Sequence, residues 1–121
     1  MMNPEVKAEW LAALRSGAYK QAQARLFDPE TGGYCCLGVL CDIAEKRGVI
    51  KRRVDDDGIV WFGNSYTVVE DRRVREWAGL DCSNPELPHV KGPDYVSSSA
   101  AGHNDNGLSF AEIADLIEQH L

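Results

Sequence analysis

Cysteine is the most concentrated of the reactive residue types in this chain. Three of the four cysteines, Cys35, Cys36 and Cys41, fall in the apolar run Tyr34–Asp42. A thiol at a helix start can have a lowered pKa and act as a nucleophile, whereas a free cysteine in an apolar run is more often a small buried hydrophobic residue. We expect the buried role, so that recognition depends on polar groups around the thiols.

A second segment with chemical potential is the polar run Gly102–Gly107, which contains His103, Asn104 and Asp105. It directly precedes a strong helix start, and the backbone N–H groups at such a start suit anions or polar ligands. Its composition is also that of a turn, because Asn and Asp tolerate left-handed dihedral angles. The two roles are compatible, and we expect a turn that contributes to a ligand site.

The main rival hypothesis joins these segments into a cysteine-dependent hydrolase or transferase. Cys35 or Cys36 would be the nucleophile, His103 would be the base, and Asp105 or Asn104 would orient that base. The local signatures of papain-like and related thiol peptidases are absent from the sequence. The residue types therefore allow this chemistry without indicating it.

The sequence does not indicate a metal site or a cofactor site. Structural zinc needs two pairs of closely spaced ligands, but Cys82 lies far from the other cysteines. The three histidines, which complete no second pair, are His89, His103 and His120. The sequence also lacks a phosphate-binding loop and a dinucleotide fingerprint. We expect no metal and no cofactor.

Composition limits the partners. With 121 residues, the chain is predicted to be a single domain over residues 1–121. Its formal net charge of −6 predicts that it does not bind duplex nucleic acid, because such binding requires clustered Lys and Arg. A local group of basic residues could still bind a small anion. No apolar stretch reaches the length of a membrane span, and no secretory signal is recognisable. We expect no membrane partner and a cytoplasmic location.

Helices are predicted from caps and from apolar residues at helical spacing. Gly38 falls inside the predicted central helix, where glycine lowers helix stability by roughly 1 kcal/mol relative to alanine. A close approach by another backbone would explain why a residue without a side chain stands there. The predicted helices are an N-terminal one capped by Asn3 and ended by Ser16–Gly17, a central buried one over Cys36–Arg47, a short one over Asp71–Trp77, and a last one opened by the capping box of Ser109 and Glu112.

Strands are predicted from alternating residues and turn signals. Together with the helices they indicate an α+β fold, in which a small and mostly antiparallel sheet packs against the central helix and the terminal helices. The predicted strand segments are Gln21–Phe27 paired with Tyr34–Cys35, three strands within Val49–Val69, and an edge strand within Leu87–Val96. The small residues of Ser97–Gly102 are expected to be flexible.

Several motifs resemble a set of uncharacterised small proteins from phages and bacterial genomes. The motif Tyr-Cys-Cys-Leu-Gly-Val-Leu-Cys-Asp at residues 34–42 is the most distinctive. The other matching residues are Trp10, Ala13, Leu14, Ser16, Gly17, Tyr19, Gln21, Trp77–Leu80, Asn104–Asp105, Phe110 and Ile113–Glu118. His103 departs from the leucine expected before Asn-Asp, which weakens a catalytic role for it. The resemblance implies a phage or prophage origin and no particular reaction.

We therefore expect a non-enzymatic accessory binding protein, acting in the host cytoplasm if phage-encoded. By analogy, its ligand would be a small polar molecule or a nucleotide signal of host defence. Arg25 would pair with an anion, Trp61 would stack on the ligand, and polar side chains would hydrogen-bond it. The complete predicted set is Gln21, Arg25, Trp61, Asn104 and Asp105. A protein-interaction module, with a host protein or a second copy as partner, remains the further alternative.

Overall fold

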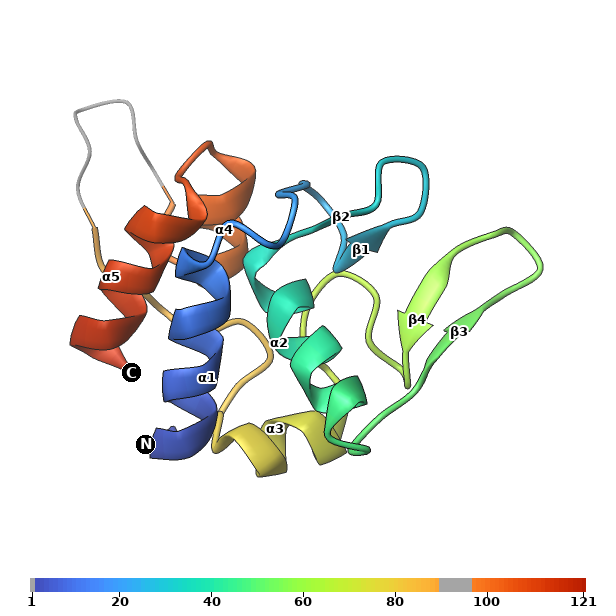
Figure 1. Ribbon diagram of the computed structural model, residues 1–121, viewed down its shortest axis with the longest axis horizontal. Helices are drawn as coiled ribbons and strands as arrows, with labels where there is room; N and C mark the ends of the chain where they lie inside the picture. The colour runs from blue at the N-terminus through green and yellow to red at the C-terminus, as the bar shows by residue number, and fades with distance from the viewer. Residues whose placement is uncertain (1, 90–96) are drawn as a thin grey trace.

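The computed structural model describes residues 2–89 and 97–121. This part of the chain contains five helices and two separate two-stranded antiparallel sheets, which confirms the α+β class (Figure 1). The helices are α1 (Pro4–Arg15), α2 (Cys36–Lys46), α3 (Arg72–Ala78), α4 (Ala100–Asp105) and α5 (Phe110–His120). The strands are β1 (Phe27–Asp28), β2 (Gly33–Tyr34), β3 (Arg52–Val54) and β4 (Val60–Phe62).

Helix α2 is the centre of the core, as predicted. Every residue from Cys36 to Ala44 is buried, and the helix lies between α1 on one side and the two hairpins on the other (Figure 1). A Cβ atom at Gly38 would stand 1.8 Å from the carbonyl oxygen of Leu26. The predicted close approach of another backbone is therefore confirmed, and it explains a glycine at this buried position.

The other predicted helices are confirmed by their caps. Asn3 accepts the N–H of Glu5 at the start of α1, and Ser109 and Glu112 form a complete capping box at the start of α5. Helix α3 begins after Asp71 and ends at Gly79, whose left-handed φ of 73° suits a residue without a Cβ atom. These local signals fixed the helix ends because they depend on neighbouring residues only.

Helix α1 joins the central helix to the last one. Trp10 is fully buried, and its indole N–H donates to the carbonyl oxygen of Cys36 over 2.9 Å. On the other side of α1, the Arg15 guanidinium pairs with Asp115 and Glu118 of α5, at 2.7 and 2.8 Å. Burial of the Trp10 ring supplies most of the stabilisation, because exposed ion pairs contribute little.

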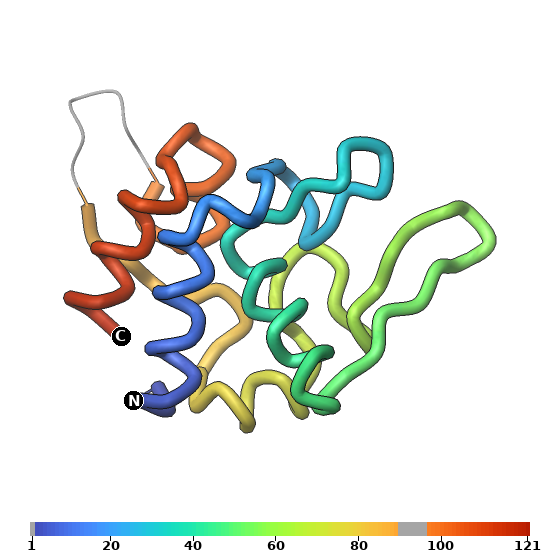
Figure 2. Tube along the Cα trace, in the orientation of Figure 1, coloured from blue at the N-terminus to red at the C-terminus, as the bar shows by residue number. Residues whose placement is uncertain are grey.

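The predicted strand over Gln21–Phe27 is wrong except at its end. The turn at Asp28–Gly33 is present, but β1 begins only at Phe27, and Gln21 makes a single parallel bridge with Tyr34. Ala24 has a left-handed φ of 71°, which interrupts an extended strand. Beyond this bridge to β2, Ala22 and Ala24 bond to side chains of α4, and Figure 2 shows the chain after α1 passing beside α4.

The second hairpin is shorter than predicted. Strands β3 and β4 pair in register from Arg52 opposite Phe62 to Val54 opposite Val60. The third predicted strand, Ser65–Val69, does not form. The chain turns back at a bridge between Phe62 and Ser65, and the Ser65 hydroxyl then accepts the N–H of Asp71 at the start of α3.

The C-terminal third differs most from the predictions. The expected turn at Gly102–Gly107 is confirmed only at its end, because residues 102–105 lie in helix α4 and the turn is formed by Asn106 and Gly107. Ser99 caps this helix by accepting the N–H of Gly102, so residues 100–102 of the predicted flexible segment Ser97–Gly102 are helical. In the predicted edge strand Leu87–Val96, residues 87–89 do not form a strand, although the neighbouring Glu86 makes an isolated bridge with Ser99 and the N–H of Leu87 donates to the carbonyl oxygen of Ser98; residues 90–96 lie outside the described residues. This helix was not predicted because glycine and asparagine have low helix propensity, which tertiary contacts outweigh here.

Candidate functional site

The three motif cysteines are packed in the core. Cys35 caps α2 by accepting the N–H of Gly38 through its sulfur, while the Cys36 thiol donates to the carbonyl oxygen of Ala100 over 3.4 Å. Burial raises the pKa of Cys35 to about 11 and raises the pKa values of Cys36 and Cys41 as well. The possibility of a lowered thiol pKa at the helix start is therefore contradicted, since burial outweighs the helix dipole.

The described side-chain contacts of His103 are with Leu87 and His89. Its ring is fully buried, its Nε2 atom hydrogen-bonds with the carbonyl oxygen of Leu87, and its edge packs on His89 at a centroid distance of 5.8 Å. Asp105, the predicted orienting group, accepts a backbone N–H instead. The arrangement thus assigns the members of the proposed triad to packing and backbone support.

Asn104 is the polar centre of the fold. It is fully buried, and its Oδ1 atom accepts the N–H of Cys36 over 3.2 Å and the Nε2 group of Gln21 over 2.8 Å. Its Nδ2 group donates to the carbonyl oxygen of Ala22 over 2.7 Å and to Asp105 over 3.3 Å. One amide therefore ties α4 to the start of α2 and to the irregular segment before β1.

Gln21 and Asp105 complete this network. Gln21 also donates to the carbonyl oxygen of Leu108 over 2.8 Å, and Asp105 accepts the N–H of Ala24 over 2.9 Å. The left-handed Ala24 is thus held in place by a carboxylate from α4. Strained backbone of this kind persists only where surrounding contacts over-determine it, and here the contact comes from Asp105 of α4.

A polar hollow of about 420 Å³ opens beside this network. We call it the amide hollow, because the side-chain amides of Gln21, Gln23 and Asn104 line it. Its remaining lining residues are Lys20, Ala22, Asp28, Thr31, Gly107 and Leu108. The structure therefore brings together two residues of the predicted site, Gln21 and Asn104, at one hollow.

The other predicted residues lie elsewhere. Trp61 donates its indole N–H to Asp55 over 2.8 Å and packs against Tyr66, with ring centroids 5.4 Å apart. Arg25 has no hydrogen bond or ion pair with the described residues. Arg25, Trp61 and Asp105 are not among the lining residues of the amide hollow. The single pocket expected from the sequence is thus divided, because β3 and β4 project away from α4 (Figure 1).

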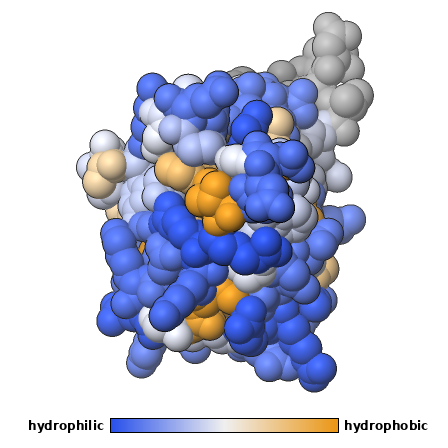
Figure 3. Space-filling model, turned by 90° about the vertical axis from the view of Figure 1, so that its right-hand side faces the viewer, coloured by the Kyte–Doolittle hydropathy of each residue, from blue (hydrophilic) through white to orange (hydrophobic). Residues whose placement is uncertain are grey.

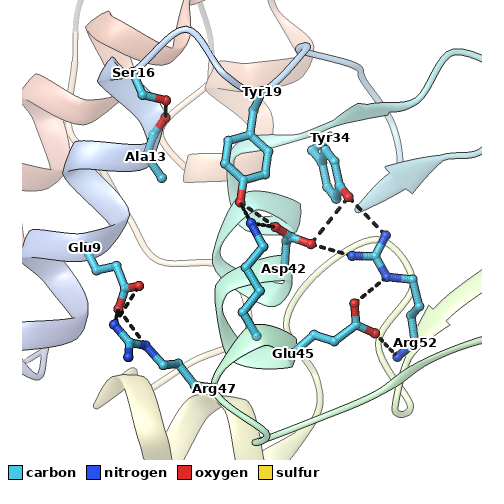
Figure 4. Close-up of polar contacts among 10 residues, drawn as sticks. Glu9, Ala13, Ser16, Tyr19, Tyr34, Asp42, Glu45, Arg47 and Arg52 are labelled. Carbon is cyan, nitrogen blue, oxygen red and sulfur yellow. Dashed lines mark hydrogen bonds and ion pairs between the residues drawn. The ribbon is translucent and has the colours of Figure 1, made fainter.

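The sequence reasoning missed a polar cluster around Asp42, which Figure 4 shows. Asp42 is 5 % exposed and accepts hydrogen bonds from the hydroxyl groups of Tyr19 and Tyr34. It also pairs with Arg52 from β3 and, over 3.1 Å, with Lys46 one turn further along α2. A signal was present in the sequence: a carboxylate in an otherwise apolar helix, with a lysine four residues later.

The cluster keeps Asp42 charged. Burial of the carboxyl group opposes its charged form, but the hydrogen bonds from Tyr19 and Lys46 and the charges of Lys46 and Arg52 outweigh burial, so its pKa lies below the ordinary value. Burial, and then the bond to Asp42, raise the pKa of Tyr19. Arg52 additionally pairs with Glu45 over 2.8 Å. The result is a compact network of compensated charges.

A second hollow, of about 550 Å³, lies over this cluster. We call it the tyrosine hollow, since Tyr19 and Tyr34 line it together with Asp42 and Lys46. Its remaining lining residues are Ala18, Lys20, Thr31 and Gly32. Lys20 and Thr31 line both hollows, so the two adjoin along one surface.

The described residues, 2–89 and 97–121, contain no group of three or more His, Cys, Asp and Glu side chains that could hold a metal ion. Within the same ranges, no helix has the length and hydropathy that a membrane crossing requires.

The comparisons with known proteins assign a family without an activity. A family model with the description "Domain of unknown function (DUF8296)" matches residues 2–121, so the chain belongs to this family. No curated protein and no solved structure matches the chain.

Proposed function

For this member of a family of unknown function, we propose a non-enzymatic binding protein that holds a small polar molecule in the amide hollow. The single observation that carries the proposal is that a buried, fully bonded amide, Asn104, organises the wall of a polar hollow. Within the described residues, the Nε2 group of Gln21 donates to Asn104 and to the carbonyl oxygen of Leu108, whereas its Oε1 atom has no hydrogen-bond partner and is not fully buried. Lys20 and Gln23 add donors at the rim.

The wall of the amide hollow is ordered before a ligand binds, which reduces the entropic cost of binding. The segment from Lys20 to Leu26 has irregular backbone, yet Asn104 and Asp105 bond to four of its residues before any ligand arrives. A wall that is already ordered loses little conformational entropy on binding. The volume of about 420 Å³ falls in the range of small-molecule sites.

The proposed protein binds its ligand without converting it chemically. The buried thiols have raised pKa values, and the polar side-chain groups at the hollow are amides, a lysine, a carboxylate and the hydroxyl of Thr31. Such groups fix a ligand by hydrogen bonds. A phage accessory protein that withholds a small polar or nucleotide signal from host defence remains the biological form of this hypothesis, motivated by the motif resemblance.

A protein-interaction module is the second candidate. Val54 is 66 % exposed, and it lies on the projecting hairpin together with Arg53 and Trp61. Arg and Trp are enriched among residues that dominate binding energy. Figure 3, however, shows a mostly hydrophilic face on this side, with small and separate hydrophobic patches. Large apolar interfaces need contiguous patches, so we favour small-molecule binding.

Ligand-observed NMR with a panel of nucleosides, nucleotides and amino acids tests the proposal. We expect at least one compound to bind, and Gln23→Ala to weaken its binding without changing the melting temperature, because Gln23 is exposed and makes only one long hydrogen bond, of 3.5 Å. Gln119→Ala is the matched control, an exposed glutamine on α5 that lines neither hollow. Absence of binding across the panel, or equal loss in both variants, would contradict the proposal.

A further inference from the structure

The tyrosine hollow has an unusual balance of hydrogen-bonding capacity. A carboxylate offers about four acceptor positions, and the Asp42 oxygens already accept from Tyr19, Tyr34, Lys46 and Arg52. The hydroxyl hydrogens of both tyrosines are used in these bonds. The one negative side chain that lines this hollow therefore has no capacity left for a ligand.

The side-chain groups that remain are mainly donors. The Lys20 side chain is exposed, and its ammonium group has no hydrogen bond or ion pair with the described residues. Lys46 is 68 % exposed and uses its ammonium group for Asp42 and Tyr19, which leaves one N–H. Thr31 accepts the N–H of Gly33 through its hydroxyl oxygen, so its O–H can point outward.

The local charge has the opposite sign to that of the whole chain. The formal net charge of the protein is −6, but the charged residues lining this hollow are Lys20, Lys46 and Asp42. Behind them Arg52 pairs with both Asp42 and Glu45, so these further charges compensate each other. A positive hollow in a negative molecule would attract an anion over a short range.

We propose that the tyrosine hollow binds an oxyanion, either a phosphate or a carboxylate, of the same small molecule whose neutral polar part occupies the amide hollow. This rests on the proposed function and adds the ligand class. Lys20 and Thr31 lie on the border of both hollows, so the anion would bind near the junction. The amide hollow offers acceptors as well as donors, through Gln21 and Asp28, as a neutral hydrogen-bonding group requires.

Amide NMR spectra recorded during separate titrations with inorganic phosphate and with acetate, at constant ionic strength, test this inference. We expect saturable shifts centred on Lys20, Thr31 and Gly32. Lys46→Gln and Lys20→Gln should each weaken the binding about fivefold, as loss of one charge-assisted contact at a solvated site would. Saturation by phosphate alone would identify phosphate as the oxyanion, and saturation by acetate alone would identify a carboxylate.

Arg72→Gln is the control, because it changes the net charge equally at a side chain that is 82 % exposed on α3. An equal loss in this variant, or shifts that rise linearly without saturation for both anions, would overturn the inference. If both anions fail while a neutral compound of the panel still binds, only the ligand class is wrong. If the panel fails as well, the proposed function falls with it.

Discussion

Asn104 shows how one buried amide can organise a site. Its two polar atoms bond to Cys36, Gln21, Ala22 and Asp105, which belong to three separate segments of the chain. A buried polar group left without its partner costs about 1–3 kcal/mol. A substitution of Asn104 therefore has to be tested for its effect on the free energy of unfolding as well as for its effect on ligand binding.

We expect Asn104→Ala to lower the free energy of unfolding by about 3 kcal/mol or more, because it leaves the buried N–H of Cys36 and the carbonyl of Ala22 without a partner. Urea unfolding measures the change. Asn106→Ala is the matched control, since Asn106 is exposed and donates to one carbonyl only. A loss no larger than that of the control would show that the network does not support the fold.

The four thiols differ in exposure, since only that of Cys82 is exposed. At neutral pH a disulfide reagent should modify one thiol of the native protein quickly, that of exposed Cys82, because Cys35, Cys36 and Cys41 are buried and have raised pKa values. Peptide mapping identifies the modified residue. Rapid native modification of Cys35 or Cys36 would revive the thiol-enzyme hypothesis.

At the scale of elements, the site depends on the fit between α2 and the segment before β1. The backbone carbonyl of Leu26 reaches the helix where Gly38 has no side chain. Gly38→Ala should destabilise the protein by at least about 3 kcal/mol, because the carbonyl is backbone and cannot move aside easily. The opposite change, Ala111→Gly on the exposed face of α5, should cost only about 1 kcal/mol. Thermal unfolding followed by circular dichroism compares the two variants.

The Asp42 cluster links α2 to β3, and it makes stability depend on pH. Because the pKa of Asp42 is lowered in the folded protein, the unfolded state binds the proton more readily, and stability present above pH 4 falls as the pH drops below about 4. Asp42→Asn should lose about 2 kcal/mol at pH 7 and show a smaller decline on acidification. Some decline remains, since Asp55 and Asp71 also have lowered pKa values. An unchanged acid profile would contradict this role.

Prediction from the sequence succeeded where local residues decide the structure. Caps located α1, α3 and α5, and Gly38 indicated a close backbone approach. It failed for α4 and for the segment after Gln21, because Asn104 and Asp105 stabilise both by contacts about 80 residues apart in the chain. Residue propensities contain no information about such contacts.

At the scale of the whole molecule, the two hollows form one polar surface. Gln21 and Asn104 were correctly expected to lie together, whereas Trp61 lies on a hairpin whose direction no local pattern indicates. The Asp42 cluster was missed although its partners lie closer in the chain, Tyr19 at 23 residues and Arg52 at 10 residues from Asp42, because no local pattern indicates that these side chains meet at α2. The central claim is that this polar surface binds a small molecule.

Native mass spectrometry of the protein purified from its own host tests that claim most directly. We expect the chain to carry an added mass in the range of a small metabolite, and denaturation to release it as an intact anionic compound. The same purification of Lys20→Gln should yield less of the complex. A chain with no added mass under gentle conditions, or an added mass that survives denaturation as a covalent adduct, would contradict the account.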